Sequence, residues 1–339
     1  MPLDAAEAIA AQTTIADARR IDPDRIPIID VSALASDDGA AHERVGYELA
    51  DAFVSMGFCY LSGHGVPQKL IDDAFAALPR FFEHDVAQKN LVPINKNMRG
   101  FMGMHRHTQV HGKKPNRSES FIFGTDLPAN DPDRLAGKPF HDTNYWPPVA
   151  NFREPLEAYW RALQPFAYRL LRGISLSMGQ PAGFLDAMYK KPDSLLRCVH
   201  YPPALGEFDG QFGAGPHTDN GSLTILAQDN VGGLQIKTMA GEWIDALPIP
   251  GTFVFNVGDM IMRLTNGRFR STPHRVVSAK RTRYSMPLFF FTDYDARIAP
   301  LPNFVDADHP PQFEPIIWGD YLQGEFFKAY DHYKEKPTA

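Results

Sequence analysis

The sequence has very little cysteine. Among its 339 residues there are two, Cys59 and Cys198, and both lie in apolar surroundings without CxxC or another metal-type spacing. This pattern argues against a disulfide-stabilised secreted scaffold. We therefore expect two reduced thiols in the core and a reducing, cytoplasmic compartment.

Long apolar runs and an excess of positive charge are also missing. The N-terminal segment MPLDAAEAIAAQTTIADARR contains no apolar stretch long enough for a signal peptide or a spanning helix. The formal net charge of -6 argues against nucleic acid or an anionic membrane as the main partner. What this composition leaves open is a small neutral or polar molecule.

The first half of the chain mixes predicted strands and helices. Short β-branched runs at 26–34 and 58–67 predict strands, and apolar residues at helical spacing predict helices over 40–57 and 154–179. From 95 to 148 the chain is rich in Gly, Pro, Asn, Arg and His and has no clear periodicity. We expect long loops there that line a site.

After residue 195 the chain consists of short apolar runs between turns: LLRCVHY, SLTILAQ, GLQIK, TFVFN, MIMRL, RVVSA and YSMPLFFFT. Strands at this spacing indicate a β-sandwich or barrel, and the later segment IIWGDYLQGEFFKAY predicts a helix. No repeat or low-complexity tract interrupts the chain. We therefore expect one enzyme-sized unit: a loose lead at 1–22, an α/β region at 23–180 and a β-rich core at 181–330.

A possible metal site lies in the segment GPHTDNGSLTILAQD. Residues two apart in a strand point to the same side, so His217 and Asp219 project together while Thr218 faces away. A third ligand, His274, sits at the mouth of another apolar strand. Two histidines and one carboxylate form a facial triad that suits Fe(II) and leaves positions open for oxygen. The alternative is a strand-edge pair bonded to the backbone or to each other.

Several separated segments resemble the isopenicillin N synthase-like family of iron(II) and 2-oxoglutarate-dependent dioxygenases. They are GPHTDNGSLTILAQDNVGGLQI, GEWIDALPIPGTFVFNVGDMIMRLTNGRFRSTPHRVV, RYSMPLFFF, IPIIDVSAL and GFCYLSGHGVP, and they span about residues 25–325. The resemblance implies a mainly β fold with flanking helices around a double-stranded β-helix, or jelly roll. It also implies that iron is held by His217, Asp219 and His274.

The resemblance further implies a site for the cosubstrate. Arg283 and Ser285 lie two apart, so a guanidinium and a hydroxyl share one face of a strand, and in the family this pair binds the distal carboxylate of 2-oxoglutarate. Without the resemblance, the basic run KRTR would instead indicate that Arg283 is an ordinary solvated charge. Tyr201 matches a tyrosine that hydrogen-bonds the cosubstrate. Many relatives have asparagine two residues before that tyrosine, and here Val199 stands instead, so we expect that polar contact to be absent.

The substrate pocket is the least defined part of the prediction. Phe289 shares strand parity with Arg283 and Ser285, so it faces either the cavity or the core, and Asn256 has the same ambiguity. Arg99 and Arg117 are candidate anchors for an acidic substrate. They belong to the irregular segment 97–121, whose other polar candidates are His105, His107, His111 and Ser118.

The expected activity is the one that the resemblance implies: Fe(II), 2-oxoglutarate and O2 oxidise an unactivated C–H bond of a small molecule, with release of succinate and CO2. Hydroxylation is the expected outcome, with desaturation, demethylation, ring closure or ethylene formation as variants. An oxidase of the isopenicillin N synthase type, which uses no 2-oxoglutarate, is the first alternative. A metal-poor, non-catalytic binding protein of the same fold is the second.

Overall fold

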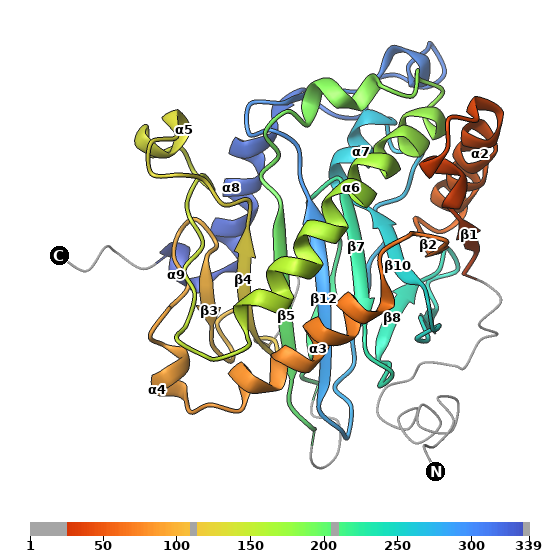
Figure 1. Cartoon of the computed structure of the whole chain (residues 1–339). Helices are drawn as coiled ribbons and strands as arrows, with labels where there is room; N and C mark the ends of the chain where they lie inside the picture. The colour runs from red at the N-terminus through yellow and green to blue at the C-terminus, as the bar shows by residue number, and fades with distance from the viewer. Residues whose placement is uncertain (1–25, 109–113, 205–209, 335–339) are drawn as a thin grey trace.

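The computed structural model describes residues 26–108, 114–204 and 210–334 (Figure 1). The predicted loose lead at 1–22 and the candidate His111 lie outside these residues. Both cysteines are buried and free, as predicted.

Two β-sheets form the centre of the molecule. The larger has eight strands in the order β1-β2-β10-β7-β12-β5-β4-β3, and the smaller has four in the order β6-β11-β8-β9. The strands of the larger sheet are β1 (Ile28–Asp30), β2 (Phe58–Ser62), β10 (Phe253–Val257), β7 (Leu223–Gln228), β12 (Arg283–Phe290), β5 (Leu195–Tyr201), β4 (Glu119–Gly124) and β3 (Gly100–Met102). Those of the smaller are β6 (Ala214–His217), β11 (His274–Val276), β8 (Leu234–Lys237) and β9 (Trp243–Asp245), and β13 (Arg297–Ile298) pairs separately with β14 (Ile316–Ile317).

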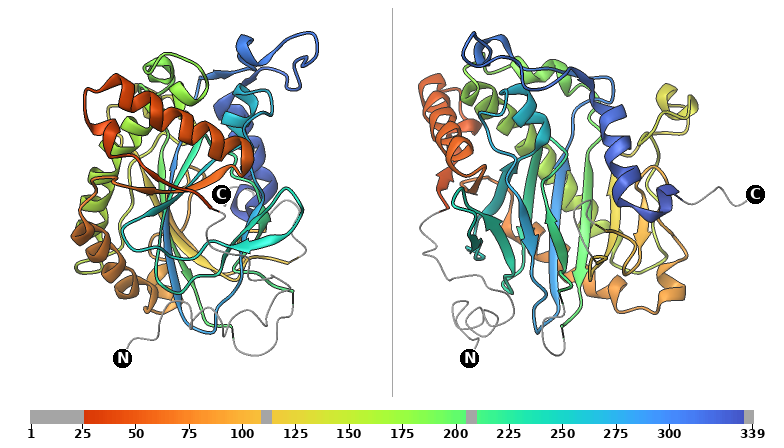
Figure 2. Two further views of the ribbon diagram at one scale, coloured as in Figure 1. Left: turned by 90° about the vertical axis from the view of Figure 1, so that its right-hand side faces the viewer. Right: turned by 180° about the vertical axis from the view of Figure 1, so that it is seen from behind.

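Helices cover one face of the larger sheet, and the smaller sheet covers the other. In Figure 1 helices α6 and α3 cross in front of the strands, and in the reverse view of Figure 2 they lie behind them. The helices are α2 (Gly39–Ser55), α3 (Gln68–Phe82), α4 (Val86–Lys89), α5 (Pro132–Leu135), α6 (Arg153–Ser177), α7 (Asp259–Leu264), α8 (Trp318–Ala329) and α9 (Asp331–Lys334), with 3-10 turns at Ser32–Ala35, Phe184–Met188 and Pro302–Phe304. Within the described ranges, none of them is both long and apolar enough to cross a bilayer.

The long helix α6 shows why the sequence folds this way locally. Its residues Leu156, Tyr159, Leu163, Phe166 and Leu170 recur at intervals of three and four, so they form one stripe, and all of them are buried. This stripe packs into the main core between the helices and the larger sheet. The helices predicted over 40–57 and 154–179 are confirmed as α2 and α6.

A second, smaller core fills the space between the two sheets. It contains Phe58 and Val254 from the larger sheet and Ile236, Ile244 and Val276 from the smaller one. Because the strands alternate their faces, one side of each strand in the larger sheet packs on the helices and the other side faces this inner space. The site described below lies at the edge of this inner core.

The prediction of a strand at MIMRL is wrong, because this run forms most of helix α7. A short apolar run fits a buried strand or a buried helix equally well, and its sequence alone does not separate them. The backbone amides of Asp259 and Met260 donate to the carbonyls of Asp219 and Gly221, at 2.8 and 3.2 Å. Contacts between distant segments therefore select the helix, and they fix the loop that follows β6.

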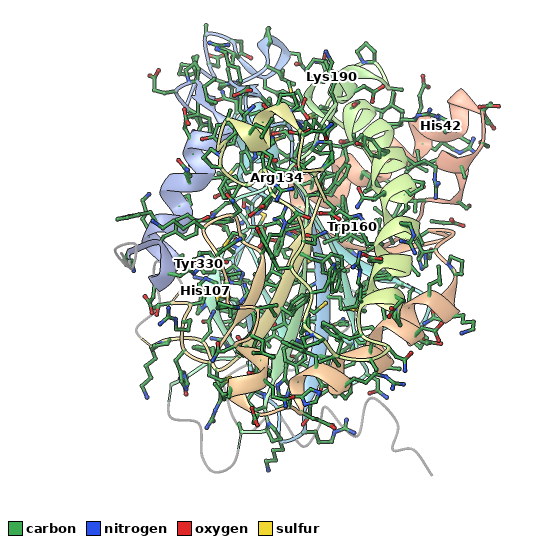
Figure 3. The ribbon with its side chains drawn as sticks, turned by 60° about the vertical axis from the view of Figure 1, so that its left-hand side comes forward. His42, His107, Arg134, Trp160, Lys190 and Tyr330 are labelled. Atoms are coloured by element: carbon green, nitrogen blue, oxygen red, sulfur yellow. The ribbon has the colours of Figure 1, made fainter. Side chains whose placement is uncertain are left out.

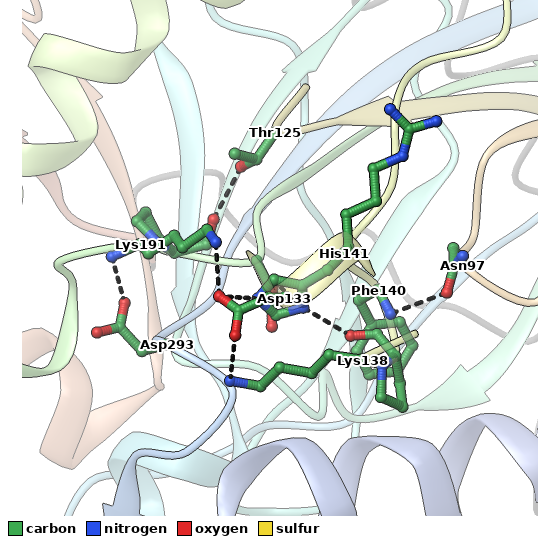
Figure 4. A network of polar contacts seen from close by, with 12 residues as sticks. Asn97, Thr125, Asp133, Lys138, Phe140, His141, Lys191 and Asp293 are labelled. Atoms are coloured by element: carbon green, nitrogen blue, oxygen red, sulfur yellow. Dashed lines mark hydrogen bonds and ion pairs between the residues drawn. The ribbon is translucent and has the colours of Figure 1, made fainter. Parts of the chain in front are cut away.

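The loops between 95 and 148 are held by a polar network at one end of the larger sheet. Asp133 pairs with Lys138 and Lys191, and the backbone amide of Lys191 donates to Asp293 (Figure 4). The hydroxyl of Thr125 donates to the carbonyl of Pro192 at 2.8 Å. These contacts tie the predicted loop region to the segment that enters β5.

Candidate active site

Three side chains from the smaller sheet and the loop beside it meet at one point. His217 ends β6 and His274 begins β11, and the two residues are direct partners in the antiparallel pairing. The Oδ1 atom of Asp219 lies 3.8 Å from Nε2 of His217 and 3.6 Å from Nε2 of His274. One ligand atom from each residue falls within 4.8 Å of the others, so the predicted triad is spatially assembled.

The backbone sets the tautomer of both histidines. Nδ1 of His217 lies 2.7 Å from the carbonyl oxygen of Gly215, and Nδ1 of His274 lies 3.2 Å from that of Thr272. A carbonyl can only accept, so each Nδ1 carries the proton and donates it. Each Nε2 then presents a lone pair toward Asp219, which is the arrangement that metal-binding histidines use.

Asp219 is oriented in the same way by two donors. Its Oδ2 accepts from Oγ1 of Thr224 at 2.6 Å and from Nδ2 of Asn256 at 2.8 Å. The other oxygen, Oδ1, is left facing the two imidazoles. Asn256, which the sequence placed in the pocket or the core, therefore touches the triad directly through the carboxylate.

The electrostatics keep these groups in the form that binds a metal. Burial, followed by the nearby His274, lowers the pKa of His217 to about 4. Burial acts to raise the pKa of Asp219, but the imidazoles and the two hydrogen-bond donors outweigh it and lower that pKa below its usual value. At neutral pH the site thus offers a carboxylate and a neutral imidazole, the protonation states that a divalent cation requires.

Replacing Asn256 by leucine tests the support of Asp219. We expect affinity for Fe(II) to fall roughly 10–100-fold, because loss of a partner that orients a metal ligand typically costs that much. Affinity is measured by anaerobic competition with a chelator. Thr224→Ser, which keeps the hydroxyl donor, is the matched control and is expected to bind Fe(II) like the wild type. Unchanged affinity in Asn256→Leu would show that Asp219 does not need the hydrogen bond from Asn256.

A cavity between the two sheets runs from the triad to Arg283, Ser285 and Tyr201. Arg283 and Tyr201 are direct partners across β12 and β5, and the guanidinium carbon lies 4.7 Å from the centre of the phenol ring. The hydroxyls of Ser285 and Tyr201 are 3.5 Å apart. The three residues that the sequence assigned to the cosubstrate therefore share one wall.

Arg283 makes no ion pair with a carboxylate in the described part of the chain. The side chain is 1% exposed, its Nε donates to the carbonyl of Gly232 at 2.7 Å, and its Nη1 makes no hydrogen bond. Burying a cation without a carboxylate in contact costs folding free energy unless a bound anion pairs with it. This wall of the cavity is thus suited to an anion.

A second, larger cavity of about 220 Å³ opens on the other side of the triad. Its apolar walls include Phe289 and Phe291 from the β12 strand and its end, and Leu322 and Phe326 from α8. Phe289, predicted to face either the cavity or the core, lines both cavities. Helix α8, far along the chain from the other walls, closes this side of the site.

The structure does not place Arg99 or Arg117 along either cavity. Arg99 is 1% exposed, and its guanidinium donates to the carbonyls of Asn97, Thr125 and Phe140, so it holds loops together. The backbone amide of Arg117 donates to a carbonyl at 2.8 Å, and its half-buried side chain lines neither cavity.

Arg197 on β5, which the sequence analysis missed, is a cation that lines both cavities. Arg197, Val199 and Tyr201 alternate along the strand and all line the cavity between the sheets, and Arg197 also lines the larger cavity. Strand parity with Tyr201 was the signal that could have identified it. His107 in the segment 97–121 lines the larger cavity as well, whereas His105 is exposed.

Comparison with known proteins gives consistent matches over most of the chain. A family model described as the 2OG-Fe(II) oxygenase superfamily matches residues 192–292, and one described as the non-haem dioxygenase in morphine synthesis N-terminal matches residues 26–149. The 2-oxoglutarate-Fe(II) type oxidoreductase hxnY of Emericella nidulans is 31% identical over 318 residues, covering 91% of each chain. Homoarginine-6-hydroxylase 2-ODD-C23 of Glycine max is 32% identical over 88% of this chain and 96% of its own.

Solved structures extend the likeness to three dimensions. A full-length Neurospora crassa protein in complex with alpha-KG and thymine superimposes with a TM-score of 0.78 at 28% identity, and the match covers 88% of this chain and 95% of the other. A putative 2OG-Fe(II) oxygenase family protein from Caulobacter crescentus gives the same TM-score, 0.78, at 29% identity. That match covers 89% of this chain and 98% of the other.

Proposed function

The chain belongs to the 2OG-Fe(II) oxygenase superfamily, and from this premise we propose that His217, Asp219 and His274 hold its iron. The protein is an Fe(II)- and 2-oxoglutarate-dependent dioxygenase with a jelly-roll core, so the fold class and the class of enzyme predicted from the sequence are confirmed. The observation that carries the assignment of the ligands is the arrangement of the two Nε2 lone pairs around Oδ1 of Asp219.

The donor set fits ferrous iron. Two imidazoles and one carboxylate are the ligands of the facial triad used by non-haem Fe(II) oxygenases. When bound, Fe(II) with 2-oxoglutarate and O2 supplies the oxidation of a C–H bond, with release of succinate and CO2. The protein's own residues orient the ligands through backbone carbonyls, Thr224 and Asn256, and their burial keeps competing water away.

We assign the distal carboxylate of 2-oxoglutarate to Arg283 and Ser285. Arg283 offers a planar fork of N–H donors and a buried positive charge, and Ser285 adds a hydroxyl on the same wall. Tyr201 stacks its ring beside the guanidinium and directs its hydroxyl toward Ser285. Val199 lines the same cavity without a polar group, in line with the expected loss of one family contact.

The substrate is a small molecule, oxidised in the larger cavity beside Phe289 and the triad. The Neurospora crassa protein forms a complex with thymine, a small molecule of this kind. The net charge of -6 supports the further proposal that neither nucleic acid nor a membrane surface is the partner. The two free, buried cysteines support a cytoplasmic setting.

The reaction is tested by measuring succinate in the presence of Fe(II), 2-oxoglutarate and O2 across a library of small molecules. We expect succinate release to rise with the true substrate, and the product to gain one oxygen atom. A product that has lost two hydrogens instead would assign desaturation. Substrate oxidation without succinate would contradict dependence on 2-oxoglutarate and favour the isopenicillin N synthase-type oxidase.

A further inference from the structure

Arg197 carries unused hydrogen-bond donors into the larger cavity. Its Nε donates to Oγ of Ser120 at 3.1 Å, which fixes the guanidinium against β4. Elsewhere in the described ranges it has no hydrogen bond and no carboxylate within ion-pair distance, although it is half-buried. Its terminal N–H groups and its positive charge are thus available to a ligand.

The tautomer of His107 is fixed by Asn116. The backbone amide of Gly215 donates to Oδ1 of Asn116 at 2.9 Å, so the other end of that side chain, Nδ2, is the donor that lies 3.2 Å from Nδ1 of His107. Nδ1 therefore accepts, and neutral His107 must carry its proton on Nε2. Burial lowers the pKa of His107 well below its usual value, which keeps the ring neutral.

His107 is also held rigidly. It is 6% exposed, and its ring stacks on that of Tyr330 with centroids 4.2 Å apart and planes at 18° (Figure 3). His107 and Tyr330 both line the larger cavity, so this rigidly held ring can offer its Nε2–H group to a ligand there. Among the described residues, the one side-chain hydrogen bond of this ring is the contact of Nδ1 with Asn116, so Nε2–H is left for a ligand.

The acidic groups around this cavity are already engaged. Asp219 belongs to the triad, and Glu325 pairs with Lys328 at 2.6 Å. Asp259 accepts from the hydroxyl of Tyr321 at 3.2 Å. Arg197 and His107 therefore remain as donors among the phenylalanine side chains, beside the amide of Asn220, which can donate or accept.

We propose that Arg197 and His107 together bind a carboxylate of the substrate, so that the enzyme oxidises a small carboxylic acid. Arg197 supplies the charge and His107 a neutral N–H, while the apolar body lies along Phe289, Phe291 and Phe326 beside the triad. A cavity of about 150 Å³ holds one benzene ring, so the 220 Å³ found here suits an acid of about ten non-hydrogen atoms. This inference rests on the proposed function, because it places the substrate next to the metal site.

The test uses three acids as probes, benzoate, cyclohexanecarboxylate and hexanoate, each beside its neutral amide. Binding to the zinc-substituted protein saturated with 2-oxoglutarate is measured by calorimetry. We expect at least one acid to bind the wild type roughly tenfold or more tightly than its amide, as one charge-assisted contact provides. If no acid exceeds its amide, the proposal is overturned.

Variants assign the effect to the two residues. We expect Arg197→Gln and His107→Phe each to lower the affinity for the acid roughly 10–100-fold. The phenylalanine keeps a ring that can stack on Tyr330. His105→Asn, a change at the exposed neighbour, is the matched control and is expected to bind the acid like the wild type. Wild-type affinity in both test variants would contradict the assignment.

Two further readouts separate this proposal from the others. In the 15N spectrum of histidine-labelled, zinc-substituted protein, His107 is expected to show a protonated Nε2; a protonated Nδ1 would contradict the hydrogen-bond argument. The anaerobic charge-transfer band of Fe(II) with 2-oxoglutarate reports on the proposed function by itself. If the wild-type protein forms no such band, the proposed function is contradicted. If the band forms but no acid binds more tightly than its amide, only the inference about the substrate carboxylate is contradicted.

Discussion

Replacing Asp219 by alanine is expected to abolish turnover and to weaken Fe(II) binding by well over about 100-fold, more than losing a partner that merely orients a ligand. The substitution removes the carboxylate oxygen that both Nε2 atoms face. It also leaves the side-chain donors of Thr224 and Asn256 without their acceptor in a buried place. Bound iron is measured by anaerobic chelator competition, and turnover by succinate release.

Asp186→Ala, at an exposed carboxylate in the 3-10 turn Phe184–Met188, is the matched control. It is expected to bind iron and to turn over like the wild type. If Asp219→Ala bound iron with wild-type affinity, the metal would lie elsewhere. That result would also contradict the assignment of His217 and His274 as iron ligands.

Replacing Arg283 by leucine is expected to raise the KM for 2-oxoglutarate by about 10- to 100-fold, since a hydrogen-bonded charge contact contributes about 1.5–3 kcal/mol. The KM rises because leucine removes the guanidinium that is proposed to bind the distal carboxylate of 2-oxoglutarate. Affinity for Fe(II) alone is expected to stay unchanged, because Arg283 touches no member of the triad. Steady-state kinetics and metal titration on the same preparation measure the two effects separately.

Arg283→Lys keeps the charge but loses the fork, so its KM for 2-oxoglutarate is expected to lie between those of the wild type and Arg283→Leu. Circular dichroism confirms that both variants fold. A normal KM for 2-oxoglutarate with a raised KM for the substrate would instead mean that Arg283 and Ser285 hold the substrate.

The parts of the site that the sequence predicts are those set by short-range geometry. The alternation of His217 and Asp219 about Thr218, and that of Arg283 and Ser285, places each pair on one face whatever the surrounding fold. His274 was a candidate because it sits at the mouth of another apolar strand, and the family resemblance supported it, whereas Tyr201 came from the resemblance alone. The structure brings all of these residues together around one cavity.

Other features depend on contacts between distant segments, which no local pattern carries. The run MIMRL is helical because the amides at the start of α7, those of Asp259 and Met260, donate to the carbonyls of Asp219 and Gly221. Arg99 was a candidate substrate anchor in the sequence, yet its two terminal nitrogens donate to backbone carbonyls of three loops and its side chain lines neither cavity. The orientation of His107 depends on Asn116, Gly215 and Tyr330, and the last of these lies at the far end of the chain.

The most direct test of the account is an anaerobic titration of the wild-type apoprotein, first with Fe(II) and then with 2-oxoglutarate, followed by visible absorption. Chelation of iron by a 2-oxo acid produces a weak charge-transfer band. We predict that one equivalent of iron binds and that the band forms and saturates with 2-oxoglutarate. Iron binding without any band would contradict the account, because the cavity of Arg283 and Ser285 would then not deliver 2-oxoglutarate to the metal.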